Sequence, residues 1–342
     1  PARFNTVCLL YAFFQVIWFT HEGQAQKKPW YEQPQPRFAN SDLGRVFSGT
    51  IDLRDSRRDT TRKALAIRVG DSLEAGSTAT VIFDTELMKF SAAIPDRFVM
   101  FNTYRDGLGG AGHWVGPPYI FSTRHEPGWA RDGKFDDPRE RKNGSLPRDW
   151  AKYQGLYRHG PRTVLSYTVG QTAVLDMPWL EGEGDARVVT RNIEVAASDQ
   201  PMQLKVCDAE GATGDVETEG DRTWLLLQQG ETVTAIGLVA DAKSSEHCRL
   251  HKTDDGRVLV DVAARNDVAR LKLLISSRTN KDMQQFVDSV KKSELPESLA
   301  AWTKPGPRQW PDPLITQGEL GEGDGPYVVD TITAPYKNPH NV

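Results

Sequence analysis

The chain has 342 residues, of which 42 are Lys or Arg and 46 are Asp or Glu, so its formal net charge is −4. This length suggests one large or two ordinary domains with a sizeable core, and the hydrophobic and charged fractions, 38% and 26%, are ordinary for a globular protein. A net negative charge with scattered basic residues gives no electrostatic reason to bind nucleic acid.

The first 25 residues have the pattern of an export signal. A basic residue precedes an apolar run over 7–19, and Gly23 and Ala25 follow in a small-x-small arrangement. The pattern predicts a signal peptide over 1–25, and the apolar run is short for a membrane span. We therefore expect an exported protein, periplasmic or extracellular, with no membrane span once the signal is removed; a retained anchor is the alternative.

Strand patterns dominate the chain after a Pro/Gln-rich lead-in over 26–45, which is expected to be extended. Alternating apolar residues predict strands over 64–70 and 78–94. An irregular stretch then runs from Asn102 to Gly155, where Gly and Pro are frequent. Loops of this length are usually functional or disordered, and the Trp and Tyr content of this one argues against disorder.

Tight turns divide the next 120 residues into predicted hairpins. Gly170-Gln171 predicts a type II′ turn between strands over 157–180. The other predicted hairpins join 186–197 to 202–208, turn at Gln229-Gly230, and turn at Asp255-Gly256 in the type I′ geometry, before a last strand over 269–277. Short strands with regular turns predict a large antiparallel β-sandwich, which we place at 46–295.

One short amphipathic helix is predicted near the end of this domain. Apolar residues recur with helical spacing over 283–290, and Thr279 or Asn280 is available as the N-terminal cap. Residues 296–326 are rich in Pro and Gly and are expected to form a linker. Residues 327–342 are strand-like at first and are expected to begin a missing downstream domain. The predicted fold class is all-β, with long loops and this one helix.

Three histidines, His113, His125 and His159, lie in or beside the long irregular stretch. Histidines with nearby carboxylates can bind zinc or transfer protons. No fixed metal-binding spacing connects them, so loop histidines bonded to backbone or water are the alternative. No haem-attachment motif occurs. Turn formation explains the Asp-rich segments without a bound calcium ion, and neither matches the EF-hand spacing. No metal or cofactor is therefore expected in this piece.

Aromatic side chains gather in the same stretch and beside it, where Arg158 is also near. Rings on loops can stack on sugars, while neighbouring polar groups bond the hydroxyls. Such rings can equally pack the loop onto the sandwich. The ligand-binding candidates are Trp114, Tyr119, Trp129, Tyr157, Arg158, His159, His113 and His125.

Two cysteines, Cys207 and Cys248, remain after Cys8 leaves with the signal. Each lies beside a predicted strand. In an oxidising compartment they are candidates for a disulfide, and the alternative is two unpaired small core residues.

Several long motifs point to a family. The segments KALAIRVG, TVIFDTELMKFSAA, PGWARDGKFDDPR, LPRDWAKYQGLYRHGPRTVLSYTVGQTAVLDMP and GPYVVDTITAPYKNP resemble, in that order, an uncharacterised N-terminal domain of large exported bacterial proteins. The resemblance implies a place before a propeller similar to sugar or sorbosone dehydrogenases, in proteins that sometimes carry a cytochrome c domain. It supplies no catalytic residues.

We therefore expect a non-catalytic exported β-sandwich module that contacts a polysaccharide or glycan, or docks the neighbouring propeller domain of the same chain. One alternative is a carbohydrate-active hydrolase or lyase that uses His, Tyr and Arg of the loops. Another is a structural module of a cell-envelope assembly.

Overall fold

A computed structural model describes residues 44–53, 60–73, 77–101, 113–140, 142, 144–241, 243–279, 283–308 and 312–334. All of them lie in one unit, Gln35–Val342. The predicted signal peptide and nearly all of the lead-in lie outside these residues. The part of the chain that is described is mostly antiparallel strands, so the predicted all-β class is confirmed.

One layer of the fold contains a sheet with seven strands among the described residues, in the order β5-β6-β1-β2-β3-β4-β7. Neighbours are antiparallel except for the parallel pair β1 and β6. The strands are β1 (Val46–Asp52), β2 (Thr60–Val69), β3 (Ala79–Asp84), β4 (Lys89–Pro95), β5 (Met100–Phe101), β6 (His113–Trp114) and β7 (Phe121–Ser122).

A second sheet forms the facing layer, with eight strands in the described ranges in the order β13-β14-β15-β18-β11-β10-β9-β8. Its strands are β8 (Ala151–His159), β9 (Arg162–Val169), β10 (Thr172–Glu181), β11 (Val188–Val195), β13 (Val216–Glu219), β14 (Arg222–Gln229), β15 (Thr232–Ala240) and β18 (Ala269–Arg278). A smaller sheet, in the order β12-β17-β16, consists of β12 (Met202–Asp208), β16 (Cys248–Lys252) and β17 (Arg257–Val262).

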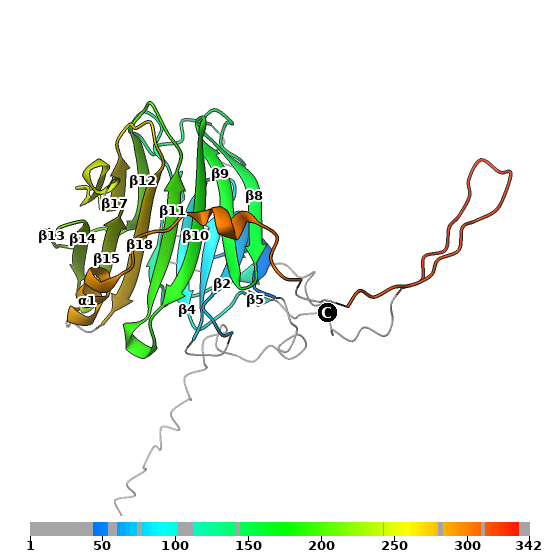
Figure 1. Cartoon of the computed structure of the whole chain (residues 1–342), viewed down its shortest axis with the longest axis horizontal. Helices are drawn as coiled ribbons and strands as arrows, with labels where there is room; N and C mark the ends of the chain where they lie inside the picture. Colours follow the sequence, from blue (N-terminus) through cyan, green and yellow to red (C-terminus); the bar gives the residue numbers. More distant parts are fainter. Residues whose placement is uncertain are drawn as a thin grey trace, which may run out of the picture. The chain divides into compact units, whose positions relative to one another are not determined.

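The main hydrophobic core lies between these layers. It contains Phe83 of β3, Leu165 of β9, Leu273 of β18 and Val260 of β17, so all three sheets contribute to it. Figure 1 shows β8 to β11 in front of β2 and β4, and β15 and β18 in front of β12 and β17. The seven-stranded and three-stranded sheets thus form one layer opposite the eight-stranded sheet, which is the sandwich that the strand pattern predicts.

Short helices cover the outer face of the eight-stranded sheet. Helix α1 (Gln284–Lys292) places Phe286 and Val290 against Ala235 and Leu274. The 3₁₀ helix η5 (Leu299–Thr303) buries Leu299 against β9 and β10, although it lies within the predicted linker. The remaining 3₁₀ helices of the described chain are η3 (Gly184–Ala186) and η4 (Ser245–His247). No helix in these ranges is long and apolar enough to cross a membrane.

Several predicted local features are confirmed and others are wrong. The turn at Gly170-Gln171 joins β9 to β10, and Gly170 has the positive φ, 57°, that a type II′ turn requires at this position. The predicted type I′ turn at Asp255-Gly256 is wrong, because only Gly256 of that pair has a positive φ and Thr253 accepts its N–H at 3.0 Å.

The predicted hairpin between 186–197 and 202–208 is also wrong. Strand β11 pairs with β10 and β18, whereas β12 pairs with β17 in the other layer, so the chain crosses between the sheets here. Helix α1 begins one turn later than predicted, with Met283 at its N-terminus and no side-chain cap. Asn280 lies outside the described residues.

Candidate functional site

The segment 124–131, which we call the bridging segment, joins the two sheets of one layer. On one side the Gly128 N–H donates to the Leu87 carbonyl at 2.8 Å. On the other side Lys205 donates its backbone N–H to Gly128 at 2.8 Å, and Ala130 donates to Gln203 at 3.0 Å. A Cβ on Gly128 would lie 2.1 Å from the Met88 carbonyl oxygen, so only glycine permits this close approach.

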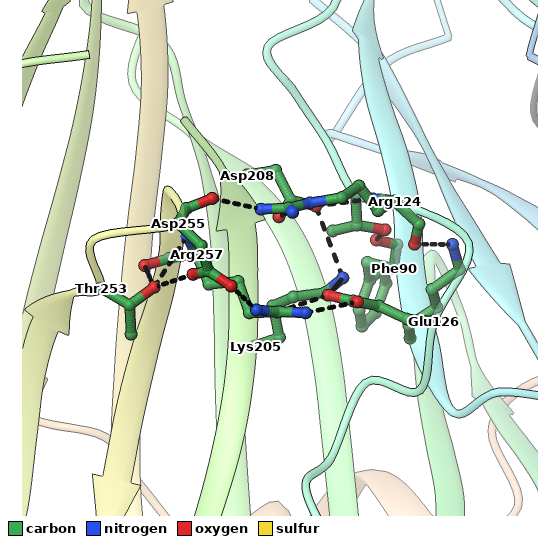
Figure 2. Close-up of polar contacts among 10 residues, drawn as sticks. Phe90, Arg124, Glu126, Lys205, Asp208, Thr253, Asp255 and Arg257 are labelled. Carbon is green, nitrogen blue, oxygen red and sulfur yellow. Dashed lines mark hydrogen bonds and ion pairs between the residues drawn. The ribbon is translucent and has the colours of Figure 1, made fainter. Parts of the chain in front are cut away.

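An ionic cluster holds the bridging segment to the three-stranded sheet, and Figure 2 shows its side chains pointing toward one another. The Arg124 Nε donates to Asp208 at 2.8 Å. The Arg257 guanidinium donates to both oxygens of Glu126, at 2.7 and 2.8 Å. The Lys205 Nζ donates to Glu126 at 2.8 Å and lies 3.4 Å from Asp208.

The surroundings of this cluster shift two pKa values in ways that suit a structural role. Burial acts to raise the pKa of Glu126, but Arg257 and Lys205 outweigh it and lower that pKa to about 2. Burial lowers the pKa of Lys205 to about 8, against the charges of Asp208 and Glu126. Because each charged group of the cluster has an opposite partner, we interpret the cluster as a clamp and not as a reaction centre.

The predicted aromatic platform is largely not available to a ligand. Trp129 is 1% exposed and lies in the core, where its Nε1 donates to the Tyr167 hydroxyl at 3.3 Å. Tyr119 is half-buried and donates its hydroxyl to the Leu53 carbonyl. Tyr157, 42% exposed, is the candidate ring that faces solvent. The side chain of Trp114 lies outside the description.

Trp129 instead begins a buried polar chain that the sequence analysis missed. The Tyr167 hydroxyl donates to the Asp176 carboxylate at 3.2 Å, and Arg191 donates to the same carboxylate at 2.5 Å. Arg191 also lies over the Phe90 ring, 4.3 Å from its centroid. The sequence signal that could have revealed this chain is that Tyr167 on β9, Asp176 on β10 and Arg191 on β11 all occupy positions that face the core.

Of the three candidate histidines, the two whose side chains are described, His125 and His159, do not meet. His125 acts electrostatically on Asp84, the last residue of β3. The preceding residue, Phe83, packs on Tyr153 of β8 with ring centroids 6.3 Å apart, so His125 lies toward the Tyr153 end of that strand. His159 lies six residues beyond Tyr153 on β8, about 20 Å further along the strand.

His159 makes its contacts at that far end of β8. Its Nδ1 lies 3.1 Å from the Lys304 carbonyl oxygen, and its ring packs edge-on against Trp302. Arg158 is exposed beside it. The arrangement therefore does not bring His125 and His159 into one acid–base centre, and the His113 side chain lies outside the described residues.

The candidate disulfide between Cys207 and Cys248 is wrong, since both thiols are free. Cys207 pairs with Val258 and Cys248 with Val262, on opposite sides of β17. Four residues along a strand correspond to about 13 Å, whereas the Cα atoms of a disulfide lie within about 7 Å. Burial raises the pKa of Cys248 to about 11, so this thiol stays protonated near neutral pH.

A cleft of about 1070 Å³ opens at one end of the sandwich, where the eight-stranded and three-stranded sheets approach each other. We call it the end cleft. The residues that line it come from segments far apart in the chain: 130–133, 149–150, 169–172, 197–203, 246–249 and 261–263. Loops at one end of a rigid sandwich are a common place for binding.

Tight turns and side-chain pairs fix the polar groups of the end cleft. Asp132 and Gly133 both have positive φ, 51° and 71°, so Arg131 to Lys134 forms the turn that the Asp-Gly pair favours. This turn holds Arg131, whose Nη2 donates to Asp149 at 2.8 Å.

A second pair lies on the strands of the small sheet. The Gln203 Nε2 donates to Asp261 at 2.9 Å, and the Nδ1 of His251 lies 3.3 Å from the other carboxylate oxygen. Val169 is half-buried and adds apolar surface to the cleft, whereas Trp150 and Met202 lie almost fully buried in its wall.

Acidic residues outnumber the arginines in the lining of the end cleft. The five acids and two arginines are Asp132, Asp149, Asp199, Glu246, Asp261, Arg131 and Arg249. Such a lining disfavours anionic ligands. Within the described ranges, no group of three His, Cys, Asp or Glu side chains could hold a metal ion.

The fold and the cleft define an all-β, two-layered protein with a polar cleft at one end. Residues 81–176 match the family described as Domain of unknown function (DUF6797). The match begins in β3 and ends in β10, and it includes the bridging segment. No curated protein matches the chain.

Proposed function

We propose that this chain is a non-catalytic binding module that holds a neutral, polyhydroxylated ligand of the carbohydrate class in the end cleft. The single observation that carries the proposal is the pairing of planar polar groups in that cleft: Arg131 with Asp149, and Gln203 with Asp261. The part-buried pair of Gln203 and Asp261 keeps its orientation before a ligand arrives, which lowers the entropic cost of binding. The Arg131–Asp149 pair is exposed and supplies charged groups at the mouth of the cleft.

The chemistry of these groups supports a sugar. Carboxylate, amide and guanidinium groups offer acceptors and donors to vicinal hydroxyls. The half-buried Val169 offers apolar surface that suits the less polar face of a sugar ring. The excess of acids over arginines argues against phosphate or an acidic sugar.

The thiol and the carboxylates that line the end cleft favour binding over catalysis. The Cys248 thiol, which lines the cleft, has a pKa of about 11 and is a poor nucleophile near neutral pH. Asp149 and Asp261 are each engaged by a neighbouring side chain. The hydrolase alternative also loses its support from converging histidines, because His125 and His159 contact different parts of the fold.

The setting of the module forms part of the same proposal. The signal-like residues 1–25 support export, and the family resemblance supports a place before a propeller domain in a longer exported protein. Expression of the chain with its first 25 residues in a secreting host, followed by N-terminal sequencing of the exported product, tests the export. Retention of an uncleaved chain inside the cell would contradict it.

The cleft is tested by applying the chain to an array of neutral and acidic oligosaccharides and titrating the best ligand by calorimetry. We expect a neutral glycan to bind, and Asp149→Asn or Gln203→Ala to weaken binding at least about tenfold, because each removes a charged or paired hydrogen-bonding group. The matched control is Glu219→Gln on β13, which alters an exposed ion pair with Lys291 of α1 and lies outside the cleft lining.

Three results would overturn the proposal. The first is no binding of any neutral glycan by the folded chain. The second is a preference for acidic glycans alone. The third is equal affinity for Asp149→Asn, Gln203→Ala and Glu219→Gln.

A further inference from the structure

The segment 312–334, which we call the C-terminal arm, forms a two-stranded hairpin beyond η5, drawn in orange to red in Figure 1. Glu319 and Thr331 exchange backbone hydrogen bonds of 2.9 and 2.8 Å. The Thr333 hydroxyl donates to the Gln317 carbonyl at 2.7 Å, and Gly321 donates to the Asp330 side chain at 2.9 Å.

Apolar side chains of the arm face solvent. Five of them are between 80% and 90% exposed: Ile315, Leu320, Tyr327, Val329 and Ile332. An isolated two-stranded hairpin is marginal in water, and a contiguous set of exposed apolar side chains marks an interaction surface. The arm thus has the character of a segment that becomes buried against a partner.

The negative charge of the arm indicates what kind of partner surface it fits. It carries five carboxylates and no Lys, Arg or His between residues 312 and 334; the acids are Asp312, Glu319, Glu322, Asp324 and Asp330. A complementary surface is therefore basic, with apolar side chains and free strand backbone for the arm to pair with.

The sandwich itself offers such a surface at β8. This nine-residue strand forms one edge of the eight-stranded sheet, and its Tyr157 is 42% exposed. Arg45, Arg158 and Arg162 gather near its end. Burial lowers the pKa of Arg45, the charge of Asp71 acts to raise it, and the charge of Arg158 acts to lower it. Burial likewise lowers the pKa of Arg162, where Asp71 and Glu181 act to raise it and Arg45 acts to lower it, so three arginines face two acids here.

The backbone that leads toward the arm passes next to this edge. His159, the last residue of β8, lies 3.1 Å through its Nδ1 from the Lys304 carbonyl oxygen. A Cβ on Gly306 would lie 2.7 Å from the His159 Cα, so the backbone before the arm is packed against the end of β8. When a chain passes its acceptor surface shortly before the donor segment begins, two copies can exchange that segment about a twofold axis.

We propose that two copies of this chain form a reciprocal dimer, in which the C-terminal arm of each copy adds to the β8 edge of the other. The apolar side chains of the arm become buried beside Tyr157, and its carboxylates approach the arginine group of Arg45, Arg158 and Arg162. The interface is separate from the end cleft, which lies at the other end of the β8–β9 hairpin.

The test is sedimentation equilibrium of the full chain over a concentration range from about 1 to 100 μM. The expected result is a monomer–dimer equilibrium, with a dissociation constant that the arm variant Ile315→Ser with Ile332→Ser raises at least about tenfold. Arg158→Glu is expected to weaken the dimer similarly, and adding Glu319→Lys to it is expected to restore part of the affinity. Lys292→Glu, an exposed charge reversal on α1, is the control for an unspecific effect of charge.

The readout separates this proposal from its competitors. A chain that stays monomeric at the highest concentration would overturn it and leave the arm for a different protein or a further domain. A dimer that the arm variants do not weaken, or an open-ended polymer, would also overturn it. Far-UV circular dichroism of each variant confirms that the sandwich is folded, because the arm contributes nothing to its core.

Discussion

Replacing Glu126 by Gln tests whether the ionic cluster holds the bridging segment in place. The substitution keeps the shape of the side chain but removes the charge that Arg257 and Lys205 share. The fall in pKa of Glu126 from 4.5 to about 2 is equivalent to about 3 kcal/mol of preference for the charged form. Some contact of the carboxylate with solvent weakens this, so we expect Glu126→Gln to reduce the free energy of unfolding by about 2 kcal/mol near neutral pH.

The pH dependence provides the sharper measurement. Because the pKa of Glu126 is lower in the folded state than in the unfolded state, its stabilisation is fully present above about pH 4.5 and is lost as the pH falls toward about 2. Urea unfolding followed by Trp fluorescence, at several pH values between about 7 and 3, gives the free energy of unfolding for both proteins. We expect the difference between wild type and Glu126→Gln to shrink across the acid range.

A matched control separates the cluster from surface charge in general. Glu219→Gln removes a carboxylate from an exposed ion pair with Lys291, and we expect the free energy of unfolding to stay unchanged. If the difference between wild type and Glu126→Gln were as large at pH 3 as at pH 7, the carboxylate charge would not be the source of the stability, and the reasoning would be refuted.

Three further predictions concern close approaches and thiols. Gly128→Ala places a Cβ 2.1 Å from the Met88 carbonyl oxygen, so urea unfolding is expected to show a loss of about 3 kcal/mol or more; an unchanged midpoint would contradict the packing of the bridging segment. In Gly237→Ala the new Cβ lies 2.4 Å from Val290 Cγ2, so the free energy of unfolding is expected to fall. The double variant Gly237→Ala with Val290→Ala is expected to lose less free energy of unfolding than the two single variants combined. Simple additivity of the two losses would count against this contact. Because its thiol pKa is about 11, Cys248 is expected to react slowly with a thiol-specific reagent near pH 7 and faster as the pH rises; rapid labelling at pH 7 would be inconsistent with its burial.

The local part of the fold could be predicted from the sequence. Alternation and turn residues identify the hairpin of β9 and β10 because both strands and their turn lie within 20 residues. The choice of distant partners could not be predicted in this way. The pattern of β12 is the same whether it pairs with β11 or, as observed, with β17, and only packing of the whole core decides between them.

The same limit applies to the candidate site. A Trp in a Gly/Pro-rich segment does not reveal the side to which it points, and Trp129 enters the core because the bridging segment pairs with β12. The end cleft is formed by Arg131, Asp149, Gln203 and Asp261, which are up to 130 positions apart in the chain. No spacing rule connects these residues, since two sheets bring them together.

The position of the bridging segment has a practical consequence for work on the matched family. The family match at 81–176 starts inside β3 and stops inside β10, and so it omits β2, β11 and the whole three-stranded sheet. A recombinant fragment with those bounds would contain the bridging segment without the strand that it joins, and would leave both large sheets with newly opened edges. A recombinant fragment intended to fold independently should therefore begin before β1 and continue past η5, beyond the bounds of the family match.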